Sequence, residues 1–334
     1  MKTILVNGQH QAESLFLSIL IPAVRINDVA LEAISSALNQ VGVDCSYEVI
    51  LLINNPEFNE YDKLPKDKRL VVYQNKTQLG MKENIRHCAE FSSARYIAYL
   101  HDDDILLKSY VKNITKILKK KDYDCLIPER YLLFSDTSYG KTLKKKAIVR
   151  QSLSFLLFFR FFYRGKIRRI YNYNNVRAME NCFGAPTCGI VFKRDLFMKT
   201  NGFESDSVFS FDFDYLTRLN ETGSIYLYAK KLGIYRMTDS ASNKPDVQYD
   251  FFKYWVSLIE TNQAKSVIKN KQFMLRLMYD IWDDNTKRLI DSSGFVPPVV
   301  SKTKYILFRI KRVLYKYFHN LDITSVYMAR SIRK

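Results

Sequence analysis

Cysteine, glycine and proline are all scarce in this chain of 334 residues. The five cysteines are odd in number and scattered without the spacing of a metal site, which argues against a disulfide framework and predicts free thiols in a reducing compartment. Only 11 glycines and 8 prolines are present, which argues against low complexity. Because 47% of the residues are hydrophobic, we expect a globular protein with one large domain, or two intimate domains, and a tail.

Targeting signals and long apolar runs are also lacking. Residues 1–14 contain one lysine and little continuous apolar sequence, unlike a signal or transit peptide. The longest aromatic and aliphatic run, residues 153–163, is interrupted by Arg160 and is too short to span a bilayer. We therefore expect a cytoplasmic protein that is not exported.

Acidic residues are nearly missing from two stretches where cations concentrate. Residues 141–177 contain eleven Lys or Arg and no acid, and residues 302–334 contain nine with one acid, Asp322. These stretches account for the whole net charge of +18, so the basicity is local. A nucleic-acid-binding protein ranks low as an alternative, because no recognised binding module accompanies the charge.

Buried strands alternate with amphipathic helices in the first part of the chain. Near-continuous apolar runs predict strands at 15–22, 48–54 and 69–75, and a fourth buried strand that begins at Tyr96 and ends in a cluster of acids. Asn27 and Asp28 can cap a helix after the first strand, and Gly80 precedes a helix at about 81–93. The alternation predicts an α/β fold with a mostly parallel central sheet and helices on both faces.

The apolar run in the stretch 96–107 ends in three consecutive carboxylates, Asp102, Asp103 and Asp104, which are expected at the C-terminal end of a buried strand. Because adjacent carboxylates repel one another, keeping them ionised needs water, basic groups or a cation, and a divalent metal is the simplest compensation. The alternative is an acidic turn with a helix cap. Residues 22–25 and Asn54-Asn55 also follow strands, so we expect all three segments at the sheet edge where ligands bind.

The order and spacing of many segments resemble a known family. The matching segments are 18–22, 30–40, 48–53, Asn75 with Leu79, Gly80 and Asn84, 96–106, 184–194, 201–203, 211–219, Gly223 and 235–237. Over about residues 15–243 they look like the inverting family-2 glycosyltransferases of the GT-A fold, of the bacterial surface-polysaccharide type. The resemblance implies a nucleotide-sugar-binding half (1–125), an acceptor-side half (126–245) with a basic aromatic insert (about 141–177), and a helical basic C-terminal extension (246–334).

By this resemblance the acidic cluster corresponds to the D-x-D-type motif, which holds Mg²⁺ or Mn²⁺ against the diphosphate of a nucleotide-sugar. His101 stands where the family more commonly has the first acid of the motif. We therefore expect Asp102 and Asp104 to ligate the metal, with Asp103 as a close alternative ligand. His101 is expected in packing or support rather than as a ligand. The implied donor contacts are Pro22, Ala23, Val24, Arg25, Asn54, Asn55, Gly80, Asn84, Asp102, Asp103 and Arg236.

The resemblance also implies a catalytic base, which removes the proton of the attacking acceptor hydroxyl. Asp212 matches it, although Phe211 replaces the glutamate that usually precedes it, and Asp214 competes for the role. On a helix the two carboxylates would point about 200° apart, so only one is expected to face the acceptor. Both could instead cap a helix.

Three departures from the family affect the expected ligand contacts. Asn54-Asn55 replaces an acidic pair, which puts uracil preference in doubt because an amide also donates. Lys82 and Arg86 are candidates for phosphate contact, although exposed helix cations are usually solvated. No histidine follows Arg236, where Asp239 or water would complete the metal site.

Two basic amphipathic segments remain. Residues 151–163 either lie on an anionic membrane or pack as an ordinary helix over the acceptor site. In 303–318, one face carries Ile306, Ile310, Val313, Leu314 and Tyr317, with Arg309, Arg312 and Lys316 on another. That helix either docks on a membrane or packs against a partner or the rest of the chain.

The leading hypothesis is a metal-dependent inverting glycosyltransferase that uses a UDP- or dTDP-linked sugar. Its acceptor would be a hydroxyl of a glycan or a lipid-linked glycan in capsule, exopolysaccharide or lipopolysaccharide synthesis. We expect it in the cytoplasm, or peripheral at the inner face of the plasma membrane, without a specific nucleic acid partner. The alternatives are a nucleotidyltransferase, which would share the carboxylates and metal, and an inactive relative or basic binding protein.

Overall fold

The structure is a computed structural model of the chain, and it describes residues 3–7, 15–134, 167–169, 187–205, 207, 209–237, 244–262, 265–318 and 324–326. Residues 151–163, most of the basic stretch 141–177, Cys182 and Asp239 lie outside the described residues. The other four cysteines are free thiols, as expected: Cys45, Cys88, Cys125 and Cys188.

The described strands form one mixed sheet in the order β1-β4-β3-β2-β5-β9-β7-β10-β6, with β11 beside β7 and β8 beside β10. They are β1 (Thr3–Asn7), β2 (Leu17–Ala23), β3 (Tyr47–Ile53), β4 (Leu70–Asn75), β5 (Tyr96–Tyr99), β6 (Ile105–Leu106), β7 (Cys125–Phe134), β8 (Ile167–Arg169), β9 (Ile190–Lys193), β10 (Ile225–Met237) and β11 (Thr324–Val326). The α/β prediction is confirmed, and β2 to β5 are parallel as expected. Beyond β5 the sheet is mixed, because β9 runs antiparallel to both β5 and β7.

Helices cover both faces of this sheet, which explains why its central strands are continuously apolar. On one face α1 (Asp28–Leu38) and α3 (Tyr110–Leu118) pack in one hydrophobic cluster. On the other, a second cluster contains α2 (Met81–Cys88), α7 (Arg194–Lys199) and α8 (Phe211–Thr222). The predicted cap of α1 is confirmed, since Asn27 Oδ1 accepts a hydrogen bond from the backbone N–H of Ala30 at 3.0 Å.

The end of β2 creates an opening in the sheet. The β2–β5 ladder ends at Leu20 and Tyr99, whereas pairing with β3 continues to Ala23. Pro22, which has no N–H, follows the last β5 pair and points to that vacated side, so its missing donor breaks no ladder bond. β2 and β5 are neighbours in the sheet, and the chain after each of them continues toward a different side of the sheet. In α/β sheets, ligands bind at this kind of switch point, beyond the carboxyl ends of the two strands.

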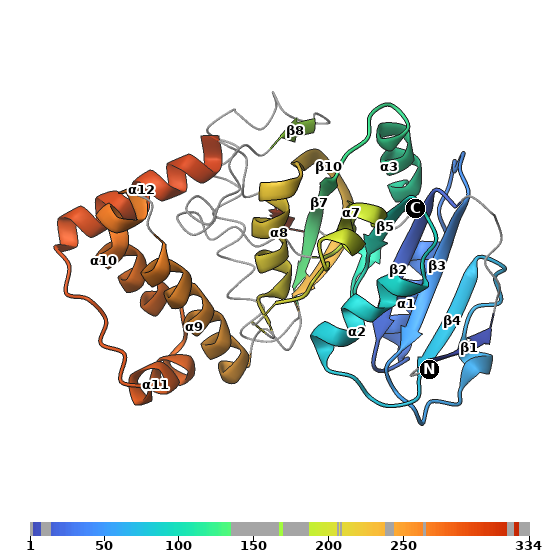
Figure 1. The fold of residues 1–334 in the computed structure, drawn as a ribbon, viewed down its shortest axis with the longest axis horizontal. Coiled ribbons are helices and arrows are strands. Elements are labelled where there is room, and N and C mark those ends of the chain that lie inside the picture. The colour runs from blue at the N-terminus through green and yellow to red at the C-terminus, as the bar shows by residue number, and fades with distance from the viewer. Residues whose placement is uncertain are drawn as a thin grey trace.

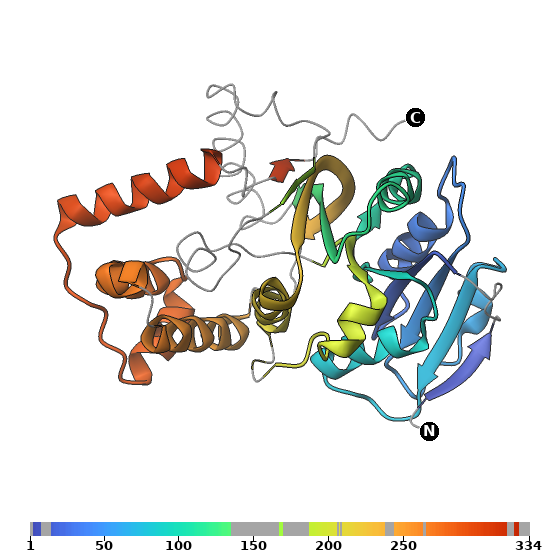
Figure 2. The same ribbon diagram turned by 45° about the horizontal axis from the view of Figure 1, so that its top comes forward.

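A helical layer follows the sheet, in agreement with the expected C-terminal extension. It consists of α9 (Pro245–Thr261), α10 (Lys265–Asp280), α11 (Asp284–Ser292) and α12 (Lys302–Phe318), which share a third hydrophobic cluster. The layer lies at the end of the molecule opposite to β1–β4 (Figures 1 and 2). Phe213 and Trp255 join α8 to α9, with ring centroids 4.4 Å apart. Among the described helices, none has the length and apolar content to cross a membrane.

Candidate functional site

The acidic loop lies at the opening between β2 and β5. As predicted, a buried strand is followed by the acids at its C-terminal end, because Asp102 and Asp103 form the turn that separates β5 from β6. The backbone of Val24, just after β2, makes a hydrogen bond to the Asp102 carboxylate. Pro22 and Ala23 are buried in the sheet and Val24 and Arg25 are exposed, so only the last two have side chains at the surface of this opening.

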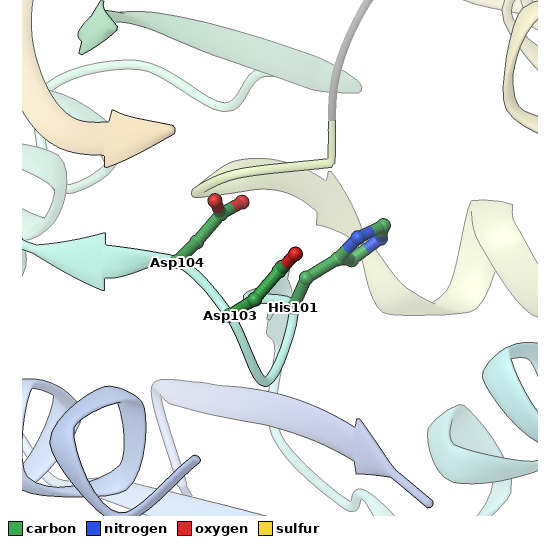
Figure 3. Close-up of side chains that lie close together, drawn as sticks. All are labelled: His101, Asp103 and Asp104. Carbon is green, nitrogen blue, oxygen red and sulfur yellow. The ribbon is translucent and has the colours of Figure 1, made fainter. Parts of the chain in front are cut away.

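His101, Asp103 and Asp104 form a group with metal-binding potential. One ligand atom from each of these residues lies within 4.8 Å of the others, and their side chains leave the same loop (Figure 3). Asp102, which the sequence analysis paired with Asp104, does not belong to this group. The imidazole Nε2 of His101 is hydrogen-bonded to the hydroxyl of Thr187, which orients the ring.

Burial gives this group its electrostatic character. Asp104 is fully buried, and burial together with the charge of Asp103 raises its pKa to about 8. Its Oδ1 accepts a hydrogen bond from the backbone N–H of Arg236 at 2.9 Å, whereas Oδ2 has no hydrogen-bond partner among the described residues. Burial lowers the pKa of His101, so its ring is neutral at pH 7, the form that ligates metals. A buried oxygen without a donor and a neutral imidazole fit a divalent cation.

Asp102 differs from Asp103 and Asp104 because its carboxylate is hydrogen-bonded to the backbone of Val24. Burial, with a contribution from the charge of Asp103, raises its pKa to about 6, while the Val24 hydrogen bond opposes this rise. The carboxylate therefore fastens the acidic loop to the end of β2.

Arg236, predicted to contact the diphosphate, holds the acidic loop in place. Its Nη1 donates to the carbonyl oxygen of Asp103 at 3.2 Å, and its Nη2 forms an ion pair with Glu32 of α1. Only 10% of the Arg236 side chain is exposed. With these partners, Arg236 fastens β10 to both the acidic loop and α1.

Asn54 is likewise committed to the protein. Its side-chain NH₂ donates to the carbonyl oxygen of Leu79 at 2.9 Å, and its Oδ1 accepts from the backbone N–H of Leu79 at 2.8 Å and from Asn75 at 2.9 Å. Asn75 also donates to the buried Asn84 at 2.9 Å. The side chains of Asn54 and Asn84 therefore shape the loop before α2 from inside, while Asn55 is partly exposed.

The start of α2 contacts the second half of the chain. Gly80 caps α2 and precedes two cations, Lys82 and Arg86, which were candidates for phosphate contact. Both instead form ion pairs with Glu204, and Lys82 also donates to the carbonyl oxygen of Ser205.

The two candidate bases on α8 have different environments. Asp214 accepts hydrogen bonds on both oxygens, from Arg218 Nε at 3.0 Å and from the Tyr254 hydroxyl at 2.8 Å. Asp212 is partly buried and accepts from the backbone N–H of Phe213 at 2.7 Å. Burial raises the pKa of Asp212 to about 6. Asp214 is therefore a structural link between α8 and α9, whereas Asp212 is the better candidate for chemistry.

Tyr235 and Arg130 are site residues that sequence reasoning missed. Burial and the negative charges of Asp104, Asp103 and Asp212 all raise the pKa of Tyr235, so carboxylates of both the acidic loop and α8 act electrostatically on this phenol. The Arg130 guanidinium carbon lies 5.7 Å from the centroid of the Tyr235 ring, and its charge also acts on Asp104. Arg130 occurs in an ordinary strand pattern, and only the β7–β10 pairing reveals its location.

Comparison with known proteins agrees with the resemblance noted in the sequence. The sequence profile of glycosyl transferase family 2 matches residues 18–200, more than half of the chain. The chain belongs to this family. No curated protein sequence matches this family-2 glycosyltransferase significantly.

Solved structures resemble the enzyme in fold. S. aureus TarS 1-349 has 11% sequence identity and a TM-score of 0.50, over 92% of this chain and 82% of that one. Its complex with UDP has 13% identity and a TM-score of 0.51, over 92% and 88%. Its complex with UDP-GlcNAc has 12% identity and a TM-score of 0.50, over 79% and 71%. The expected GT-A fold and glycosyltransferase class are confirmed.

Proposed function

We propose that this glycosyltransferase uses a divalent cation and transfers a sugar from a nucleotide-sugar with inversion at the anomeric carbon. The observation that carries the proposal is the group formed by His101, Asp103 and Asp104, whose ligand atoms lie within 4.8 Å of one another. The charge of Asp212, like the charges of Asp103 and Asp104, raises the pKa of Tyr235. A base and a cation-binding group suit transfer between a diphosphate donor and a hydroxyl acceptor. The TarS complexes with UDP and UDP-GlcNAc support a uridine diphosphate donor.

His101, Asp103 and Asp104 would hold the cation, which when bound neutralises the charge that develops on the leaving diphosphate. Their donor set has two carboxylates and one imidazole. Because Mg²⁺ favours oxygen ligands and water, the imidazole favours Mn²⁺ over Mg²⁺. Arg130 adds a fixed positive charge beside Asp104 and is suited to the same diphosphate.

Asp212 would act as the base. Its carboxylate takes the proton of the acceptor hydroxyl while that oxygen forms a bond to the anomeric carbon. The bond from the anomeric carbon to the diphosphate oxygen breaks on the opposite side, which inverts the configuration. The pKa of about 6 leaves Asp212 ionised at neutral pH and still basic enough to accept the proton.

The proposed acceptor is a growing surface glycan or a lipid-linked glycan. We propose that the transfer takes place at the cytoplasmic side of the membrane. The family membership and the sequence resemblance to enzymes of the surface-polysaccharide type support this class of acceptor.

The decisive experiment incubates the purified protein with UDP- and dTDP-sugars in Mn²⁺, in Mg²⁺ or in EDTA, and measures donor binding and release of the nucleoside diphosphate. We expect release with at least one UDP-sugar, faster in Mn²⁺ than in Mg²⁺ and absent in EDTA. Asp103→Ala should abolish metal-dependent release, and Asp212→Asn should retain donor binding. If no donor is bound or cleaved with any divalent metal, the proposal is wrong. Release of pyrophosphate would indicate a nucleotidyltransferase instead.

A further inference from the structure

Helix α12 carries an apolar stripe that faces solvent. Ile306, Leu307 and Ile310 are 47%, 54% and 49% exposed. The opposite side of the helix is used for packing, because Tyr305 and Phe308 stack on Phe273 of α10 with ring centroids 6.3 and 5.6 Å apart. The helical layer therefore holds α12 by one face and leaves the apolar stripe on the other.

Cations border this stripe on both sides. At 100° per residue, Lys302 and Arg309 lie along one edge of the stripe, and Lys304 and Lys311 lie along the other. All four side chains are exposed. No acidic residue occurs in the sequence from 302 to 321. Long basic side chains on both sides of an apolar stripe are the pattern of a helix that lies in the plane of a membrane surface.

We propose that α12 docks this enzyme on an anionic membrane surface, with Ile306, Leu307 and Ile310 inserted between headgroups and the flanking cations at lipid phosphates. Charge complementarity selects this occupant, because each exposed cation is attracted to the negative surface of an anionic bilayer. A second copy of the chain would present the same cations, and like charges oppose that contact. Lysine is also depleted from the centres of protein interfaces. The end of the molecule formed by α9–α12 would then face the bilayer (Figure 2).

The test measures sedimentation of the full-length protein with vesicles of phosphatidylcholine alone and with vesicles that also contain phosphatidylglycerol. We expect binding to the anionic vesicles only, and less binding as salt concentration rises. Ile306→Ser with Ile310→Ser should weaken binding by about tenfold or more, because their insertion is lost.

The charge variant and the matched control complete the design. Lys304→Glu with Lys311→Glu should weaken binding by about tenfold or more. Leu5→Ser with Val41→Ser removes apolar side chains of similar exposure, 52% and 53%, elsewhere on the surface, and should leave binding unchanged. Circular dichroism verifies that each variant is folded.

A fluorescence measurement separates insertion from simple charge attraction. Leu307→Trp should shift its emission to shorter wavelength on anionic vesicles and be quenched by brominated lipid. Equal binding to neutral and anionic vesicles, or undiminished binding of the Ile306/Ile310 variant, would overturn the proposal. The proposal would also be overturned if sedimentation velocity showed that the Ile306/Ile310 variant had lost a dimer of the parent protein while it still bound vesicles. None of these readouts depends on sugar transfer, so this inference and the proposed function can fail separately.

Discussion

Asp212 and Asp214 are two residues apart on α8, and their hydrogen-bond partners assign them different roles. Asp214 is held by Arg218 and Tyr254, so both of its oxygens are engaged in joining helices. Asp212 is partly buried, its charge raises the pKa of Tyr235, and no cation is among the groups that shift its own pKa. A carboxylate of this kind is costly to bury in its charged form and is suited to proton transfer.

Replacement of each carboxylate should separate catalysis from stability. We expect Asp212→Asn to lower kcat by roughly 10²- to 10⁴-fold with little change in donor affinity, because the base is lost. Asp214→Asn should instead lower the free energy of unfolding by about 1–3 kcal/mol, because an amide NH₂ can face Arg218 Nε. Turnover assays, UDP calorimetry and urea unfolding measure these effects. A larger loss of kcat in the Asp214 variant would reverse the assignment.

The rate should depend on pH through Asp212. Since the base must be ionised and its pKa is about 6, kcat should rise with pH, reach a plateau above about 7, and fall roughly tenfold per unit below 6. The measurement is a kcat profile at saturating donor and Mn²⁺. A rate that is independent of pH from 5 to 7 at these concentrations would contradict the role of Asp212.

The same raised pKa predicts a gain in stability on mutation. The folded state binds the Asp212 proton more tightly than the unfolded state, so this stabilising contribution is present below about pH 4 and lost as pH rises through 6. The free energy of unfolding of Asp212→Asn should therefore exceed that of the parent by up to about 3 kcal/mol at pH 7, and should differ little from it at pH 4. Urea unfolding at both pH values tests this. Equal differences at the two pH values would contradict it.

Among the elements, the loop before α2 depends on a buried amide. Asn54 donates to and accepts from the backbone of Leu79, which only a side chain with both kinds of group can do. A carboxylate at this position, which the resemblance to the family would lead us to expect, offers acceptors alone. Asn54 therefore makes a contact to Leu79 that an ionised acid could not make.

Asn54→Asp should destabilise the protein. The new carboxylate oxygen would face the carbonyl oxygen of Leu79, so we expect a loss of about 1–3 kcal/mol in the free energy of unfolding at pH 7. Protonation at low pH restores a donor and should recover part of the loss. Asn55→Asp is the matched control, since the side-chain oxygen of Asn55 accepts from the backbone N–H of Glu57, as a carboxylate oxygen also could. It should change stability by less than about 0.5 kcal/mol. Thermal and urea unfolding measure the stability of both variants. Equal losses in Asn54→Asp and Asn55→Asp would show that the hydrogen bond from Asn54 to Leu79 is unimportant.

On the scale of the whole molecule, the helical layer and the sheet are joined through α8 and α9. Phe213 is buried against Trp255 at this junction, on the same helix that carries Asp212. Both tryptophans of the chain, Trp255 and Trp282, belong to the helical layer. Tryptophan fluorescence therefore reports on this layer, whereas circular dichroism reports on all helices and strands.

Phe213→Ala should uncouple the two parts. In the parent protein we expect fluorescence and circular dichroism to show the same urea transition, because the junction is packed. The variant should lose about 3–5 kcal/mol and show the fluorescence transition at lower urea. Phe16→Ala, at a partly buried ring far from the junction, should keep the two transitions together. Separate transitions in the parent would contradict the coupling.

Much of the fold was predictable because it rests on local patterns. The strands of β2 to β5 follow from apolar runs, and the start of α1 follows from the Asn27 cap. The helix predicted at 81–93 ends earlier, at Cys88, and continues as a 3-10 turn over Ala89–Phe91. The carboxylates predicted at the C-terminal end of the strand that begins at Tyr96 do follow β5, and Asp102 and Asp103 form a turn there.

By itself the sequence determined the α/β class, the acidic cluster after a buried strand and the pair of carboxylates on α8, because periodicity and residue type act over a few neighbouring positions. Only the tertiary structure decided which of these groups share a site. The pairing of β10 with β6 and β7 brings Tyr235 and Arg130 to the acidic loop, and burial then sets the charge states of His101 and Asp104. Contacts between residues a hundred positions apart arise from packing of the whole sheet, which no local pattern encodes.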